Sequence, residues 1–382
     1  MIEDSAIHSK TQLVVLQPTP FCNINCRYCY LPDRSSTMRM TMETLARILE
    51  AIFSSPFIAD PLTIAWHAGE PMVLPLSFYH EAYRCIKETN RQDVRVTTTI
   101  QTNGTLITQE WCDFINHHQI NIGVSLDGPQ FLHNRSRLDR AGRGTFVQTM
   151  RGIKLLQQNS IEPTVLMVLT DEALEYPDEI WQFFTQQNLT RIGFNLEEIN
   201  GAHTQSSLQS EASRDKYKRF FTRLLELHAS ATNPLFIREV DTLLNRIRFL
   251  ARPVQSMENT PMAMLSFDAQ GNASTFASEL LTMSYPHLGN FHLGNVHKST
   301  LEEMRTSPKL ARINAEIQAG VNQCRQKCDY FAFCGGGSPV NKLSEHSTLT
   351  CTETMHCKLK IQTAIDAALE YLDPLDDTFK MR

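Results

Sequence analysis

The chain has 382 residues, of which 42% are hydrophobic and 20% are charged, and its formal net charge is −5. This composition is typical of a globular protein that is long enough to bury a substantial core. The acidic balance argues against a nucleic-acid partner, and no apolar run or signal sequence points to a membrane or to secretion. We therefore expect a cytoplasmic protein.

Short β-rich segments alternate with amphipathic helical segments through the first half of the chain. Strands are expected at residues 13–16, 62–66, 95–100, 120–125, 163–169 and 191–196. Helices are expected at residues 41–53, 77–88, 108–117, 145–157 and 177–186. Six strand–helix units predict a parallel sheet with helices outside it, either doubly wound or rolled into an incomplete barrel.

The pattern changes after residue 200. Two more helices are expected at 213–228 and 240–249, followed by a hairpin within 264–276 and a Cys- and Gly-rich, loop-rich segment from residue 324. We predict three regions: an α/β domain, a helical linker and a loop-rich domain, at residues 1–205, 206–255 and 256–382.

Ten cysteines are present, which is many for a cytosolic chain. Eight of them fall at residues 22–29 and 324–357, and clustered cytosolic cysteines more often bind metal than form disulfides. Cys22, Cys26 and Cys29 follow the first strand as Cys-x3-Cys-x2-Cys. Three thiolates can hold three irons of a 4Fe–4S cluster and leave the fourth iron open to a cofactor. A zinc site that lacks one ligand is the alternative.

The triad and the tyrosine behind it, Tyr30, resemble the radical S-adenosylmethionine (radical SAM) superfamily. Residues 66–71, Trp-His-Ala-Gly-Glu-Pro, resemble its Gly-Gly-Glu-Pro motif, with Ala68 in place of the first glycine. The resemblance implies an incomplete (β/α)6 radical SAM barrel, in agreement with the six units. It also implies S-adenosylmethionine as a cofactor that is cleaved to a 5′-deoxyadenosyl radical.

Polar residues near the ends of successive strands are candidates for holding this cofactor. Residues 133–146 resemble a stretch of the peptide-modifying branch, His-Asp-x2-Arg-x4-Gly-x-Gly-Ser-Phe, with Asn134 in place of its aspartate. Arg137 suits the cofactor carboxylate, because a guanidinium matches carboxylate geometry. Taken singly, each residue also suits a solvated loop or a helix cap. The cofactor-binding candidates are Tyr28, Ala68, Gly69, Glu70, Pro71, Asn103, Ser125, Asp127 and Arg137.

The second cysteine group resembles the SPASM domain, which carries auxiliary 4Fe–4S clusters in peptide-modifying radical enzymes. A four-cysteine zinc site is the alternative. The predicted ligands are Cys324, Cys328, Cys334 and Cys357, with Cys351 as the alternative to Cys357.

A complete SPASM domain has seven cysteines and two clusters. Here Ser266, Phe276 and Ser338 stand about where three of these cysteines belong. We therefore expect one auxiliary 4Fe–4S cluster in a SPASM-like domain.

Residues 16–22, 66–71, 193–198 and 291–296 resemble the GrrM/OscB-type cyclophane-forming peptide maturases. The resemblance implies a crosslink from an aromatic ring to a side-chain carbon in a ribosomally synthesised precursor peptide. A reductant such as flavodoxin or ferredoxin would supply the electron. Glu197 and Glu198 are the candidates for the base that takes the ring proton.

Two alternatives stay open at this stage. One is a sulfatase-maturing radical SAM enzyme, which oxidises a Cys or Ser to formylglycine but normally has all seven SPASM cysteines. The other is a zinc- or cluster-bound peptide-binding module without catalytic activity.

Overall fold

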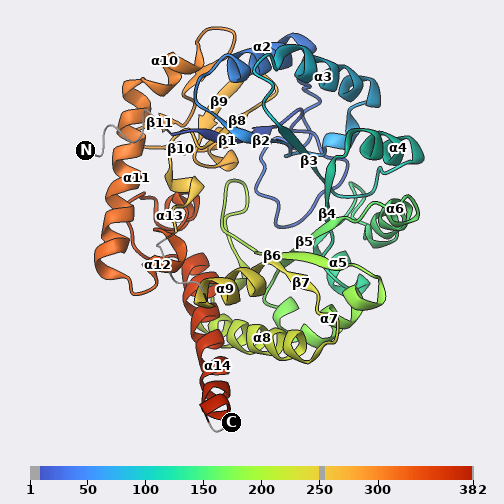
Figure 1. Cartoon of the computed structure of the whole chain (residues 1–382), viewed down its shortest axis with the longest axis vertical. Coiled ribbons are helices and arrows are strands. Elements are labelled where there is room, and N and C mark those ends of the chain that lie inside the picture. Colours follow the sequence, from blue (N-terminus) through green and yellow to red (C-terminus); the bar gives the residue numbers. More distant parts are fainter. Residues whose placement is uncertain (1–8, 249–253, 381–382) are drawn as a thin grey trace.

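The parallel sheet forms as predicted and contains the six expected strands in chain order (Figure 1). The computed structural model describes residues 9–248 and 254–380. Neighbouring strands from β1 to β6 all pair in parallel. The strands are β1 (Thr11–Leu16), β2 (Ile58–Trp66), β3 (Val96–Thr102), β4 (Asn121–Ser125), β5 (Thr164–Leu169) and β6 (Arg191–Leu196).

Helices cover the outside of this curved sheet (Figure 1). Thr41 and Thr108 cap two of them by accepting hydrogen bonds from backbone N–H groups of the first turn, as residues at helix N-caps commonly do. The short helix α5 was not predicted. The helices are α2 (Met42–Phe53), α3 (Leu76–Thr89), α4 (Gln109–His118), α5 (Gln130–Ser136), α6 (Phe146–Gln158) and α7 (Pro177–Gln186).

The second half of the chain extends the sheet at both edges. The predicted hairpin is confirmed, because β8 (Met264–Phe267) and β9 (Asn272–Thr275) pair antiparallel. β8 also pairs in parallel with β1, so a strand of the predicted C-terminal domain continues the barrel sheet. Beyond β9 lies β12 (Gly294–Asn295), and β7 (Phe236–Ile237) lies beyond β6.

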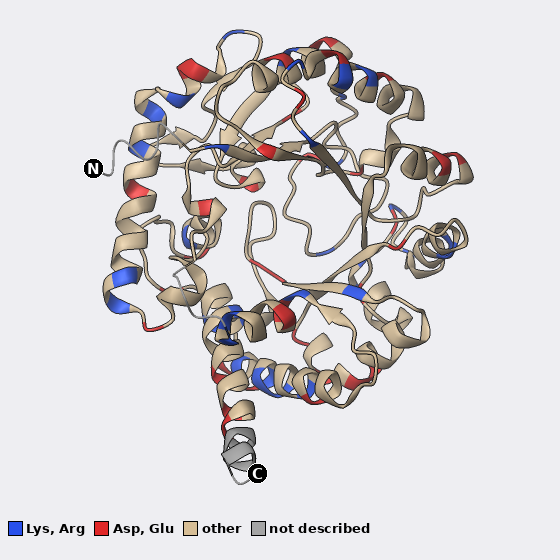
Figure 2. Cartoon of the chain, viewed as in Figure 1, with Lys and Arg blue, Asp and Glu red and all other residues tan. Residues whose placement is uncertain are grey.

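The predicted helices at 213–228 and 240–249 correspond to α8 (Glu211–Ser230) and α9 (Arg238–Arg248). Phe249, the last residue of the second prediction, lies outside the described residues, as do residues 250–253 of the predicted linker. Lys or Arg and Asp or Glu are mixed along α8 (Figure 2). In the described ranges, no helix has the length and apolar character needed to cross a membrane.

The C-terminal segment is more helical than predicted. Turns at the cysteines and at the Gly335–Gly337 run interrupt its helices. Because the segment is rich in Cys and Gly, the sequence was interpreted as loops and the helices were not predicted. The segment contains β10 (Ser284–Tyr285), β11 (Gly289–Asn290), α10 (Leu301–Arg305), α11 (Pro308–Lys327), α12 (Phe331–Cys334), α13 (Pro339–His346), a π-helix (Cys357–Thr363) and α14 (Ala364–Lys380). Short 3-10 turns lie at Pro71–Val73, Ala173–Glu175, Ser207–Gln209, Met257–Asn259 and Ser278–Thr282.

Candidate active site

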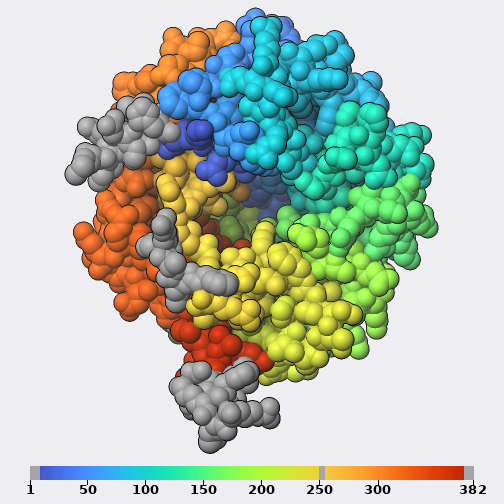
Figure 3. Space-filling view, viewed as in Figure 1, coloured from blue at the N-terminus to red at the C-terminus, as the bar shows by residue number. Residues whose placement is uncertain are grey.

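A cavity of about 780 Å³ lies at the carboxyl ends of the parallel strands. The molecule is visibly hollowed at its centre (Figure 3). Residues that follow β1, β2, β3, β4 and β6 line the cavity, together with residues of the C-terminal segment. In open parallel α/β folds this edge of the sheet carries the functional loops. The predicted cofactor residues and both cysteine groups therefore lie around one space.

The first cysteine triad forms part of the cavity wall. Cys22, Cys26 and Cys29 are free and partly buried. Burial, with Glu70 and the neighbouring thiols, raises the pKa of Cys22 to about 12, and burial raises that of Cys26 to about 11. Free thiolates are therefore disfavoured here, whereas iron would stabilise them. Three soft sulfur donors on one wall fit a 4Fe–4S cluster.

Glu70 joins the ends of β2 and β3. Its buried carboxylate accepts hydrogen bonds from Asn103 N at 2.7 Å, Thr102 Oγ1 at 2.7 Å and Met72 N at 3.0 Å. Burial raises the pKa of Glu70, and these hydrogen bonds oppose that rise. Asn103 Nδ2 in turn lies 3.8 Å from Cys22 Sγ. The polar residues predicted at two strand ends are thus connected to the cysteine loop.

Ala68 and Gly69 make a close backbone approach to the loop that carries the triad. Glu70 N donates to Phe21 O at 2.8 Å. A Cβ atom at Gly69 would lie only 2.3 Å from Thr19 O, so glycine is required there. Ala68, which replaces the glycine of the family motif, has φ +68°, a left-handed conformation that glycine adopts more readily.

Tyr28, Asp127 and Arg137 form one buried network. Tyr28 Oη donates to Asp127 Oδ2, and Arg137 Nε lies 3.1 Å from Asp127 Oδ1. Arg137 Nη1 also lies 3.9 Å from Cys26 Sγ. The guanidinium predicted for the cofactor carboxylate is therefore ion-paired with a protein carboxylate, although its buried Nε makes no hydrogen bond to it. Ser125 accepts a hydrogen bond from Gln101 Nε2 at 2.9 Å.

The second cysteine group gathers around a smaller pocket. Backbone and side-chain N–H groups approach two of its sulfurs: Gly336 N lies 3.4 Å from Cys334 Sγ, and Gln362 Nε2 lies 3.9 Å from Cys357 Sγ. Cys351 lies outside this lining but close enough to Cys324 and Lys342 to interact with them electrostatically. The cysteines that line the pocket are Cys324, Cys328, Cys334 and Cys357.

The four cysteines place soft sulfur donors around one pocket, a donor set that suits a 4Fe–4S cluster or zinc. Across residues 9–248 and 254–380, no three His, Cys, Asp or Glu side chains lie close enough to share a single metal ion. Cys334 and Cys357 also line the large cavity. The pocket thus borders the space that the first triad faces.

The positions of the missing SPASM cysteines are filled by other side chains. Ser266 is fully buried in β8, opposite Ser274 of β9. Phe276 is 1% exposed and belongs to the hydrophobic core. Ser338 lines the two pockets. The first two positions are therefore part of a packed region.

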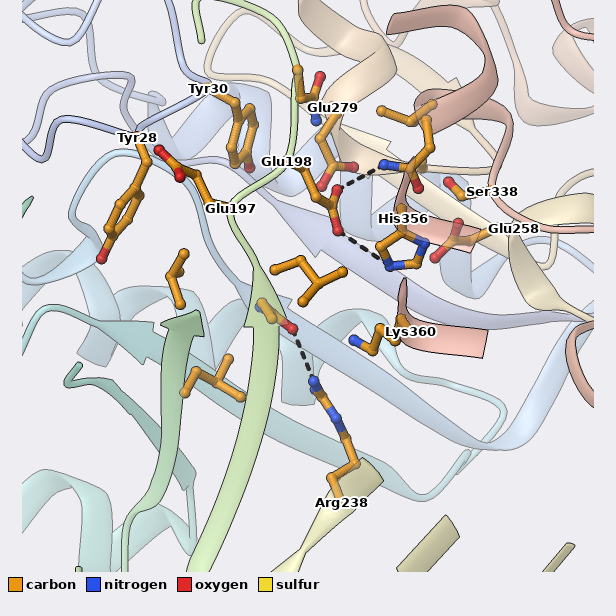
Figure 4. A pocket seen from close by; sticks show the side chains of 18 of the residues that line it. Tyr28, Tyr30, Glu197, Glu198, Arg238, Glu258, Glu279, Ser338, His356 and Lys360 are labelled. Carbon is orange, nitrogen blue, oxygen red and sulfur yellow. Dashed lines mark hydrogen bonds and ion pairs between the residues drawn. The ribbon is translucent and has the colours of Figure 1, made fainter. Parts of the chain in front are cut away.

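Glu197 and Glu198, the predicted bases, follow β6 and differ in their surroundings. Glu197 is held by the following loop, where Ser207 N donates to it at 2.9 Å and His203 Nε2 lies 3.2 Å away. Glu198 accepts a hydrogen bond from Asn341 Nδ2 at 3.0 Å and pairs with His356 Nε2 at 3.4 Å (Figure 4).

Sequence reasoning missed two further carboxylates in the cavity. Glu258 and Glu279 line it beside Glu198 (Figure 4). Burial, reinforced by Glu258 and Glu198, raises the pKa of Glu279 to about 7. Burial also raises the pKa of Glu258. Each is an isolated glutamate in the sequence, and nothing local signals that it faces the cavity.

Comparison with known proteins identifies the family. Residues 16–184 match the model of the radical SAM superfamily. A protein of Synechocystis sp., itself uncharacterized, is 41% identical over 367 residues, which cover 95% of this chain and 92% of that protein. The chain belongs to the radical SAM superfamily. A radical SAM enzyme uses S-adenosylmethionine and a 4Fe–4S cluster, and the triad facing the cavity suits that cluster.

Other relatives are similar along most of this radical SAM enzyme. The serine-type anaerobic sulfatase-maturating enzyme of Bacteroides thetaiotaomicron is 28% identical, over 88% of this chain and 84% of its own. Among solved structures, anSMEcpe with bound AdoMet and the Cp18Cys peptide has a TM-score of 0.78 at 20% identity and covers 97% of this chain and 100% of its own. Streptococcus suis SuiB bound to precursor peptide SuiA has a TM-score of 0.65 at 15% identity, covering 93% and 77%. These structures confirm the fold.

Proposed function

We propose that this radical SAM enzyme crosslinks an aromatic ring to a side-chain carbon in a ribosomally synthesised precursor peptide, forming a cyclophane. The observation that carries the proposal is the shared cavity. It extends from Cys22, Cys26 and Cys29 to Cys334 and Cys357, and carboxylates line it. A peptide is the proposed substrate because the similar structures of anSMEcpe and SuiB hold peptides.

The chemistry of such a crosslink matches the parts around the cavity. Cys22, Cys26 and Cys29 would hold the first cluster, and with S-adenosylmethionine it would supply the radical that removes one hydrogen atom from a side-chain carbon of the peptide. When that carbon joins an aromatic ring, the ring must lose one proton and one electron to become aromatic again. The peptide loses two hydrogens in total. The enzyme therefore needs a proton acceptor and an electron acceptor that face the same cavity.

Glu279 is our candidate for the proton acceptor. A general base works best when its pKa is near the working pH, and burial brings the pKa of Glu279 to about 7. Glu198 is already engaged by Asn341 and His356, and Glu197 by the loop at 203–207. Glu279 also accepts a hydrogen bond, from Ser278 Oγ at 3.1 Å, but its raised pKa makes it our preferred candidate for the base. The proposed electron acceptor is one auxiliary 4Fe–4S cluster, which would bind in the pocket lined by Cys324, Cys328, Cys334 and Cys357.

A second candidate function is sulfatase maturation. The 28% identity to the Bacteroides thetaiotaomicron enzyme over most of both chains favours it. Oxidation of a serine or cysteine to formylglycine also needs a radical, a base and an electron acceptor. Ser266 and Phe276 at two expected cysteine positions favour the crosslinking function, because they leave ligands for only one auxiliary cluster.

Co-expression with a candidate precursor, encoded beside the gene, separates the two functions. The expected product is 2 Da lighter and resists fragmentation between an aromatic residue and a nearby partner in tandem mass spectrometry. A matched precursor with the aromatic residue replaced by leucine should stay unmodified. Loss of 2 Da at a lone Ser, or of about 18 Da at a lone Cys whose sulfur is replaced by oxygen, with a product that reacts with a hydrazide, would overturn the crosslinking proposal and support formylglycine formation.

A further inference from the structure

Lys342 is a buried cation beside the second cysteine group. It lies on α13 and is 4% exposed. Its Nζ lies 3.6 Å from Cys324 Sγ. A Cβ atom at Gly320 would lie 3.1 Å from this Nζ, so the absence of a side chain at Gly320 leaves room for the ammonium.

The ammonium has no carboxylate partner in the part of the chain that the structure describes. Among the described residues, Lys342 Nζ donates a hydrogen bond to one side chain, the sulfur of Cys324. No described Asp or Glu lies within ion-pair distance of Nζ. Buried lysines are rare unless they are paired, because removing an ammonium from water carries a large desolvation cost. The position therefore calls for negative charge close to Lys342.

Ligated thiolates would supply that charge. The ammonium of Lys342 already points to one of them, the sulfur of Cys324. The other donors at the site are neutral: the Gly336 backbone N–H points to Cys334, and the Gln362 amide points to Cys357. Lys342 is thus the charged donor among the three groups that contact ligand sulfurs.

A second cation near the pocket is already engaged elsewhere. Arg246 lies close enough to interact electrostatically with Cys334. Its guanidinium donates to the carbonyl oxygen of Phe333 instead of to a ligand sulfur. The charge of Lys342 therefore has the more direct contact with the site.

We propose that Lys342 is a positioning residue that raises the reduction potential of the auxiliary 4Fe–4S cluster held by Cys324, Cys328, Cys334 and Cys357. Cluster potentials depend on net charge, on hydrogen bonds to the sulfurs and on exposure to solvent. Reduction adds one negative charge to the site, and a buried ammonium stabilises that charge. In the proposed reaction, the electron taken up is the one that the aromatic ring loses, while the ring proton goes to a carboxylate.

The inference rests on the cluster assignment and not on the identity of the substrate, so its test needs no peptide. The background is the full chain with Cys22, Cys26 and Cys29 replaced by alanine, because only the auxiliary site then gives a signal. The midpoint potential is measured by a redox titration followed by electron paramagnetic resonance. The failure of the crosslinking proposal would leave this measurement unaffected.

Lys342→Gln removes the charge and keeps an N–H donor. We expect it to shift the reduction equilibrium at least tenfold toward the oxidised cluster, a lowering of about 59 mV for one electron. Lys342→Arg keeps the charge and should stay close to the parent. The matched control is Lys327→Gln, which removes an exposed lysine one residue before Cys328. Water screens that charge, so we expect less than a twofold shift.

An iron-loaded Lys342→Gln variant with the parent potential would overturn the proposal. Iron and sulfide analysis covers the case in which a variant fails to assemble a cluster. Loss of iron from the glutamine variant but not from the arginine variant supports the charge argument. Loss from both variants means that the shape of the lysine matters rather than its charge, and refutes it. Zinc in place of iron in the parent protein also refutes it, since zinc accepts no electron.

Discussion

The close contact at Gly69 allows a test of how the predicted cofactor-binding residues 68–71 are held against the cysteine loop. Gly69 has φ +58°, and an added Cβ would lie 2.3 Å from Thr19 O and 2.6 Å from Phe21 O. Both oxygens belong to the backbone, which cannot swing aside as a flexible side chain can. Gly69→Ala must therefore displace the loop that leads into Cys22.

The expected cost has two parts. A left-handed conformation costs a residue other than glycine about 1–2 kcal/mol. Overpacking adds about 1–3 kcal/mol, so the free energy of unfolding should fall by about 3 kcal/mol in total. Gly142→Ala is the matched control, because Gly142 has φ +78° but nothing lies within 4 Å of an added Cβ. It should lose only the conformational part, about 1 kcal/mol.

Urea denaturation of the two variants and the parent under anaerobic conditions measures these costs. Binding of S-adenosylmethionine, measured in parallel, should weaken roughly tenfold or more in Gly69→Ala and stay unchanged in Gly142→Ala, since about 1.4 kcal/mol of binding energy corresponds to tenfold. Equal losses of stability in the two variants would refute the steric argument. Unchanged cofactor binding in Gly69→Ala would refute the prediction that residues 68–71 help to bind S-adenosylmethionine.

Further predictions concern the clusters, the base and the motif alanine. Replacing Cys22, Cys26 and Cys29 together by alanine should abolish 5′-deoxyadenosine formation with dithionite, and turnover at the parent rate would contradict it. Reconstituted parent should hold about eight irons and this variant about four, by iron and sulfide assay. Glu279→Gln should still form 5′-deoxyadenosine but lose crosslinking roughly 100-fold, and parent crosslinking should rise as the pH rises to about 7, because the base must be ionised. Ala68→Gly should stabilise the fold by up to about 1 kcal/mol in urea denaturation, since φ +68° suits glycine.

Local patterns were enough to predict the six parallel strands and most of their helices, whereas the choice of a barrel over a doubly wound sheet came from the family resemblance. The period-2 and helical patterns of residues 11–196 appear in the structure as β1 to β6 and their helices, because each of these elements buries a continuous apolar face. The partner of β8 was not predictable in this way. Its four residues carry too little pattern to specify pairing with β1, which lies some 250 residues earlier in the chain.

The chemistry of the site was predictable where it depends on residue type and spacing. The cysteines are of this kind, since thiol ligands occur in recognisable spacings. Glu279 and Lys342 are of the opposite kind. An isolated Glu or Lys in a sequence is normally exposed, and only the packing of distant segments buries these two. Arg137 shows a third case, because the sequence made it a candidate for the cofactor carboxylate, whereas its ion pair with Asp127 became visible only in the fold.

The pairing of β8 with β1 connects the two ends of the cavity. It places the segment after β9 beside the end of β1, where Gln17 Nε2 donates to Ser278 O at 3.2 Å in a buried hydrogen bond. Glu279 follows directly, so the proposed base is fixed to the strand that leads into the first cysteine triad. The position of a peptide carbon near that triad is thereby fixed relative to a proton acceptor on the C-terminal segment. This is what a reaction that removes a hydrogen atom and then a proton from neighbouring groups requires.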